Sequence, residues 1–93
     1  KSYLENQIEF LNLDEEKETL FKEINDKYQL KLERIKNRNN DRFAKFRDLK
    51  KLMNEKDHEI KLLLNKEQFK KFKLYQKENK NKIRNALQMR NNN

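Results

Sequence analysis

The chain has 93 residues, so it holds at most one domain of ordinary size. Charged residues make up 43% and hydrophobic residues 33%, which is thin for a compact core and favours elongated helices that bury apolar stripes against one another. No apolar run approaches the roughly 20 residues that span a bilayer. The absence of cysteine excludes disulfides and thiolate metal sites, and the absence of glycine excludes a phosphate-cradling loop.

The charge is unevenly distributed along the sequence. Residues 1–33 contain 5 Lys/Arg and 9 Asp/Glu, whereas residues 34–93 contain 19 Lys/Arg and 7 Asp/Glu. The first segment is therefore acidic, and the second carries a large positive excess. This excess predicts salt-sensitive attraction to anionic partners without specifying their kind.

The first predicted helix is short and covers about residues 2–12. Its apolar residues recur at i, i+4 and i+7, namely Leu4, Ile8 and Leu11. Asp14 is the predicted N-cap of a second helix, and the carboxylates of Glu15 and Glu16 follow where the helix dipole favours them.

The second predicted helix runs to about residue 36. One face of it carries the apolar residues Leu20, Ile24, Tyr28, Leu32 and Ile35. The asparagine-rich stretch 37–41 predicts a break, because asparagine tolerates the left-handed C′ position when glycine is missing. Asn40 or Asp41 is the expected cap of the next helix.

Two further long helices complete the predicted architecture. The stripe of the third is Phe46, Leu49, Met53, Ile60 and Leu64, with Phe43 at its margin. The stripe of the fourth is Phe69, Phe72, Tyr75, Ile83, Ala86 and Leu87. We expect a break at Asn65 rather than one continuous helix, and a frayed tail over about residues 91–93. Short connections predict that the three long helices fold back antiparallel in a hairpin-like layer.

Three leucines, Leu30, Leu62 and Leu74, lie off these stripes, about 200° around the helix from a stripe member. They are either ordinary exposed apolar residues or parts of a second contact surface. Such a surface would serve another subunit or a bound polypeptide.

The sequence contains no pattern typical of an enzyme. With no cysteine and one histidine, neither a Cys–His dyad nor a catalytic triad is available. His58 among carboxylates lacks the ligand set of a zinc site, so we expect a solvated histidine, no metal and no cofactor.

The basic residues of the last two helices are candidates for binding. On the third helix they are Arg42, Lys45, Arg47, Lys50 and Lys51. On the fourth they are Lys70, Lys71, Lys73, Lys77, Lys80, Lys82 and Arg84. Nucleic-acid binding remains open, although the aromatic residues lie on the apolar stripes rather than among these cations.

The segment Leu64 to Phe69 forms a complete helix-start signal. Asn65 can cap the helix, Gln68 can return to the cap's own N–H, and Leu64 with Phe69 can form a hydrophobic staple. A weaker copy begins at Leu13-Asp14, where lysine replaces the glutamine.

These two segments resemble the LTxxQ motifs of the Spy/CpxP family of small periplasmic helical proteins. The resemblance covers the chain from about Leu4 to Leu87 and implies one domain over residues 1–93. It further implies a cradle-shaped homodimer in the periplasm, with a signal peptide removed before Lys1. Family members include chaperones that hold unfolded proteins without ATP, envelope-stress regulators and metal-binding proteins.

We therefore expect an ATP-independent chaperone that binds non-native polypeptides on a basic and apolar concave surface. The expected contact residues are Arg42, Lys45, Arg47, Lys50, Lys51, Leu30, Leu62 and Leu74. One alternative is an envelope-stress or metal-resistance adaptor. Another is a basic helical protein that binds nucleic acid. The same interpretation implies a periplasmic location, no membrane insertion and self-association.

Overall fold

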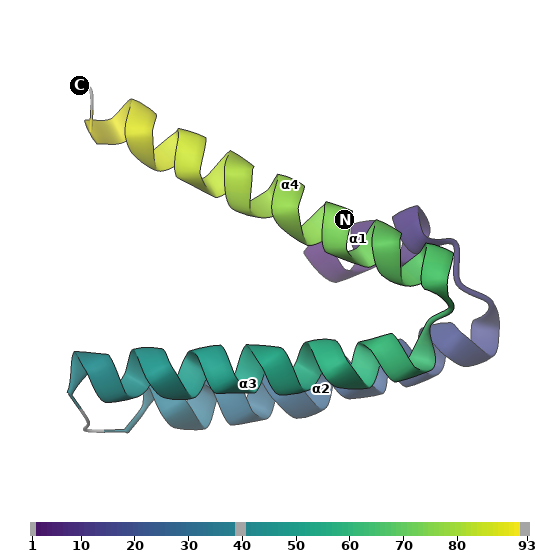
Figure 1. The fold of residues 1–93 in the computed structure, drawn as a ribbon, viewed down its shortest axis with the longest axis horizontal. Coiled ribbons are helices and arrows are strands. Elements are labelled where there is room, and N and C mark those ends of the chain that lie inside the picture. Colours follow the sequence, from purple (N-terminus) through teal and green to yellow (C-terminus); the bar gives the residue numbers. More distant parts are fainter. Residues whose placement is uncertain (1, 39–40, 92–93) are drawn as a thin grey trace. The chain divides into compact units, whose positions relative to one another are not determined.

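The computed structural model describes residues 2–38 and 41–91, except for the side chains of residue 87 and residues 89–91. Across these residues the protein is all-helical, with four helices and no strand: α1 (Tyr3–Leu11), α2 (Glu15–Lys36), α3 (Arg42–Leu63) and α4 (Lys66–Asn91) (Figure 1). The prediction of one short and three long helices is confirmed. The candidate cap Asn40 and the tail residues 92 and 93 lie outside the described residues.

Three helices begin at a capping side chain. Ser2, Asp14 and Asp41 each take an extended backbone conformation, and each side-chain oxygen accepts a hydrogen bond from the backbone N–H three residues on. The donor–acceptor distances are 3.2, 2.8 and 2.7 Å, respectively. Asp14 and Asp41 are thus the caps that the sequence predicts, because a carboxylate oxygen satisfies a backbone donor that the helix leaves unpaired.

The helix ends differ in one respect from expectation. Asn12, which follows α1, has φ 52 and ψ 54, and its N–H donates to the carbonyls of Ile8 and Glu9. This left-handed asparagine was not predicted from the sequence. In the 37–41 stretch Asn37 is right-handed, and residues 39 and 40 lie outside the described residues, so the prediction for that stretch stays a prediction. Leu64 takes an extended conformation between α3 and α4, so the predicted break at Asn65 is confirmed.

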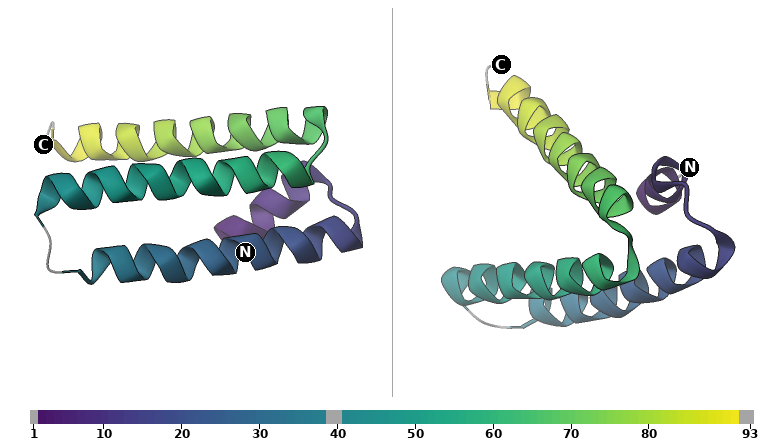
Figure 2. Two further views of the ribbon diagram at one scale, coloured as in Figure 1. Left: turned by 60° about the horizontal axis from the view of Figure 1, so that its bottom comes forward. Right: turned by 45° about the vertical axis from the view of Figure 1, so that its right-hand side comes forward.

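The chain divides into two compact units. The α2–α3 unit comprises Leu13–Asn65, and its two long helices lie side by side and antiparallel (Figure 2). One core cluster of this unit is formed by Tyr28, Ile35 and Leu52, with Ile24, Leu32 and Leu49 packed against it. Four of the five residues of the stripe predicted on α2 therefore face α3. The fifth, Leu20, is 39% exposed, and its neighbour Phe21, which the sequence did not place on the stripe, is buried instead.

The stripe predicted on α3 is wrong in part. Leu52, which the sequence did not place on it, is buried, whereas Phe46 is 67% exposed and Met53 is 43% exposed. The reason is that α3 carries two apolar rows, one through Leu49 and Leu52 and one through Phe46 and Met53. The first row packs against α2, so the second is left outside the core.

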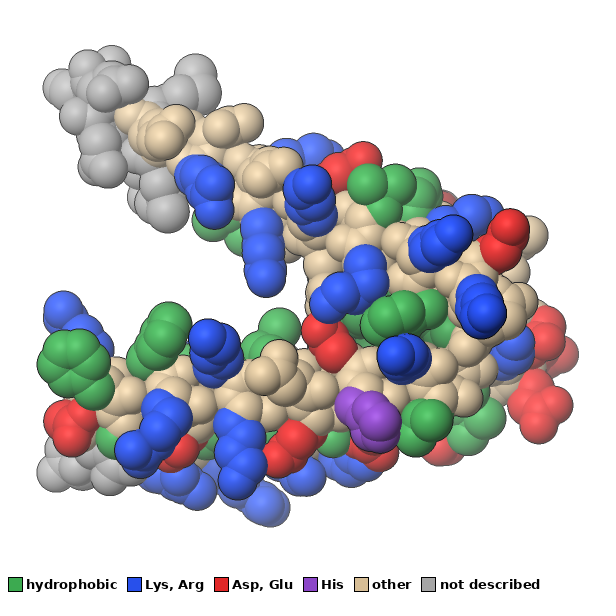
Figure 3. All heavy atoms as spheres, in the orientation of Figure 1, with side chains coloured by type: hydrophobic (Ala, Val, Ile, Leu, Met, Phe, Trp, Pro, Cys, Tyr) green, Lys and Arg blue, Asp and Glu red, His purple; other side chains and the backbone are tan. Residues whose placement is uncertain are grey.

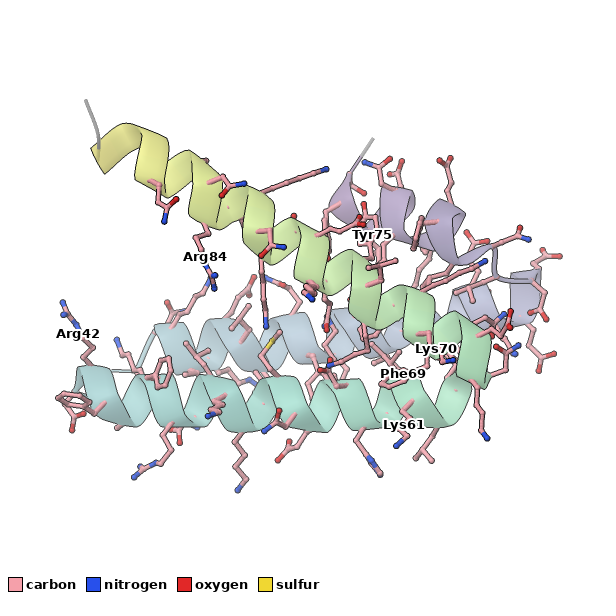
Figure 4. The ribbon with its side chains drawn as sticks, turned by 45° about the horizontal axis from the view of Figure 1, so that its top comes forward. Arg42, Lys61, Phe69, Lys70, Tyr75 and Arg84 are labelled. Carbon is pink, nitrogen blue, oxygen red and sulfur yellow. The ribbon has the colours of Figure 1, made fainter. Side chains whose placement is uncertain are left out.

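The α1–α4 unit comprises Lys1–Asn12 and Lys66–Asn93. The ring of Tyr75 lies 5.3 Å, centroid to centroid, from both Tyr3 and Phe10, and these contacts hold α1 against the first part of α4 (Figure 4). The buried side chains of the unit include Gln7, Ile8, Leu11 and Phe72.

The last part of α4 also differs from the predicted stripe. Ile83 is 54% exposed and Ala86 is exposed, although the sequence placed both on a packing face. The side chain of Leu87, from the same predicted stripe, lies outside the described residues. The nine residues of α1 are too few to cover a helix of 26 residues.

Candidate functional site

An open groove of about 820 Å³ runs along α3 in the α2–α3 unit. Tyr28 is its only lining residue from α2, and the others lie on α3: Phe46, Arg47, Lys50, Lys51, Asn54, Glu55, His58 and Glu59. Hydrophobic side chains alternate with lysine and arginine side chains along α3 (Figure 3). The groove therefore combines aromatic surface with a mainly cationic margin.

Phe46 is the central apolar residue of this surface. It lines the groove and also a second hollow of about 420 Å³, which it shares with Arg42, Lys45 and Leu49. Its neighbour Phe43, one turn earlier, is 85% exposed. An exposed pair of phenylalanines is unusual on a free surface, because each ring gains free energy when another apolar surface removes it from water.

The predicted contact residues fall into two groups. All five cations predicted on α3 line one of the two hollows around Phe46: Arg42, Lys45, Arg47, Lys50 and Lys51. The three off-stripe leucines do not line either hollow. Leu30, Leu62 and Leu74 are 59%, 74% and 48% exposed. The structure thus gathers the five cations of α3 around Phe46, whereas Leu30 and Leu62 of the same unit are not among the lining residues.

Sequence reasoning missed the aromatic part of the site. It placed both Phe46 and Tyr28 on packing stripes, and only Tyr28, at 6% exposed, is buried. The available signal was the second apolar row on α3, in which Phe43, Phe46 and Met53 recur at helical spacing. A row left over after one packing face has been assigned is a candidate binding face.

A charged link joins the two helices beside the groove. Lys27 of α2 donates a hydrogen bond from Nζ to Oε1 of Glu59 on α3 at 2.5 Å. The Nζ atoms of Lys27 and Lys31 lie 5.1 and 5.0 Å from the ring centroid of Tyr28. The two lysines and Tyr28 all lie on α2, so the link from α2 to α3 is the ion pair between Lys27 and Glu59.

The same groups shift two pKa values. The pKa of Tyr28 rises to about 12, mainly because burial disfavours the phenolate and also because Glu59 lies beside it. The pKa of Glu59 is lowered, first by the hydrogen bond from Lys27 and then by the Tyr28 hydroxyl. Glu59 is therefore a carboxylate at neutral pH.

The helix-start motif lies at the boundary of the two units. Leu64 is 7% exposed, and α4 begins directly after Asn65. Phe69 stacks on Phe72 with ring centroids 5.9 Å apart. The weaker copy places Leu13 directly before the cap Asp14, at the start of α2. Both motifs thus mark helix starts, and the staple between Leu64 and Phe69 stays a prediction.

The part of the chain that the structure describes contains no cluster of metal ligands. No group of three or more His, Cys, Asp or Glu residues that could hold a metal ion occurs there. His58 is exposed at the edge of the groove. Within the same described residues, no helix is both long enough and apolar enough to cross a membrane.

Comparisons with protein-family models, with curated proteins and with solved structures find no match to this chain. The candidate site is accordingly defined by its own geometry. It is an open groove on a helical pair, with Phe46 exposed among cations and with an anchored tyrosine on its floor.

Proposed function

We propose that the protein is an ATP-independent chaperone that holds non-native polypeptides against the groove of the α2–α3 unit. The observation that carries this proposal is the position of Phe46, which is 67% exposed and is flanked in two adjoining hollows by five cations. Exposed aromatic surface surrounded by charge is typical of a binding face rather than of a free surface.

The two kinds of residue would act in succession. The cations attract acidic segments of an unfolded chain over a distance of about 10 Å at moderate salt. Phe43 and Phe46 then contact apolar side chains that a folded protein would bury. An open groove imposes no particular shape on its ligand, so the contact suits chains of different sequence.

The resemblance to the Spy/CpxP family supports the same proposal. In that family the expected assembly is a cradle-shaped homodimer in the periplasm, and we extend both expectations to this chain. The all-helical fold with helix starts at both motifs is compatible with them.

The test is suppression of aggregation of an unrelated unfolded protein without ATP, at low salt and at an equimolar ratio. Phe46→Ala should reduce suppression at least about threefold, because it removes the largest exposed apolar contact of the groove. Leu62→Ala is the matched control. Leu62 is on the same helix and is 74% exposed, but it does not line the groove.

Three results would contradict the proposal. The first is no suppression by the unchanged protein. The second is equal loss with Phe46→Ala and Leu62→Ala, which would assign binding to scattered apolar residues. The third is capture of one stoichiometric partner together with no effect on unfolded proteins, which would favour the adaptor alternative.

A further inference from the structure

Six cations form an unbroken row along α4. They are spaced four, three, four, three and four residues apart: Lys66, Lys70, Lys73, Lys77, Lys80 and Arg84. At 3.6 residues per turn these positions stay within about 40° of one direction, over a length of about 27 Å. All six side chains are exposed. Figure 4 labels Lys70, near the start of the row, and Arg84, at its end.

The row reflects where the cations lie around α4 as well as how many cations the helix contains. The helix carries nine Lys/Arg and two Glu, and both glutamates, Glu67 and Glu78, point about 100–120° away from the row. Tyr75, which contacts α1, lies about 180° from it. Within the α1–α4 unit, α1 therefore packs on the side of α4 opposite the row.

The shape of the row restricts its ligand. A straight row on a rigid helix can bring all its charges to a flat surface at the same time. A nucleic-acid duplex suits it less. About eight base pairs of a duplex span 27 Å, and over that length the phosphates follow most of one helical turn rather than a straight line. A single strand also suits it less, because the row contains no aromatic side chain on which bases could stack.

We infer that the cationic row of α4 is a docking surface for an anionic phospholipid membrane, on which the helix lies flat without insertion. The charge of the row complements the headgroups, and lysine near an anionic surface contributes attraction that falls off within a Debye length. The inference concerns a different helix from the groove and goes beyond polypeptide capture.

Vesicle flotation in about 0.1 M salt tests the inference on the full chain. The unchanged protein should float with vesicles that contain phosphatidylglycerol and should not float with phosphatidylcholine vesicles. The double variant Lys70→Gln with Lys77→Gln should weaken partitioning into these vesicles about 30-fold. It removes two charges, and each charge near the surface contributes ~1 kcal/mol.

The matched control is Lys71→Gln with Lys82→Gln. These lysines lie on the same helix, and the change in net charge is the same, but they point about 140–160° away from the row. They would stand about a helix diameter, ~10 Å, farther from the membrane, where screening is strong. Their replacement should weaken partitioning less than about threefold, and circular dichroism should show all variants equally helical.

The inference is overturned by equal loss in both double variants, which would indicate generic attraction by net charge. It is also overturned by no flotation, or by flotation with phosphatidylcholine vesicles, which would indicate apolar insertion. Tight, row-dependent binding of a short DNA duplex without vesicle binding would assign the row to nucleic acid instead.

Discussion

Glu59 forms an ion pair that links the two helices of the α2–α3 unit. Its carboxylate accepts the hydrogen bond of Lys27 from across the helix pair, and it lies beside the buried Tyr28. Its side chain is 34% exposed, so water screens part of the attraction. A partly screened pair of this kind contributes modestly to stability and mainly fixes how α3 lies on α2.

Replacement of Glu59 gives a prediction at this scale. Glu59→Gln should lower the free energy of unfolding by about 0.5–1 kcal/mol in urea titrations near neutral pH, because it removes a partly exposed ion pair. Glu55→Gln, on the same helix with the same change in charge, should have less than half this effect.

The pH dependence follows from the lowered pKa of Glu59. Because the folded-state value lies below the ordinary 4.5, the stabilisation is present above about pH 4.5 and is lost as pH falls through the folded-state pKa. The difference between the unchanged protein and Glu59→Gln should therefore disappear in acid. A difference that persists at low pH would show that the glutamine disturbs packing instead.

The packing face of α3 is the central feature at the scale of the helix. Leu52 is 7% exposed and belongs to the core with Tyr28 and Ile35, while its neighbour Met53 is 43% exposed. One residue of displacement turns a side chain by about 100°, which is enough to move it out of the contact with α2.

Leu52→Ala should lower the free energy of unfolding by at least about 2 kcal/mol, because it leaves a cavity between α2 and α3. Met53→Ala, the adjacent position on the same helix, should cost less than about 1 kcal/mol. Chemical denaturation of both variants measures the difference. A larger cost for Met53→Ala than for Leu52→Ala would mean that α3 packs through the face that the sequence first indicated.

Helix boundaries were predictable from the sequence because their signals are local. Asp14 and Asp41 each cap a helix through a backbone N–H three residues away, and no other part of the chain is needed. The packing face of α3 was not predictable in the same way. Periodicity shows that Phe46 and Leu52 belong to different rows, but only the position of α2 decides which row is buried.

At the scale of the whole molecule, the largest positive excess and the most exposed aromatic residues lie on different helices. Most of the positive excess lies on α4, whereas the two most exposed phenylalanines, Phe43 and Phe46, lie on α3, which has seven Lys/Arg against four Asp/Glu. The sequence predicted the basic character of residues 34–93 and the cations of the groove. It did not separate the groove from the row on α4, because net charge alone does not distinguish two surfaces.

The most direct test of polypeptide capture at the groove is a nuclear magnetic resonance titration of the full chain with an unfolded protein at low salt. We predict shifts or broadening at Phe46, Lys50 and Asn54, which line the groove. We predict little change at Leu30 and Leu62, which do not. Perturbation centred on these leucines, with Phe46 unaffected, would contradict the account.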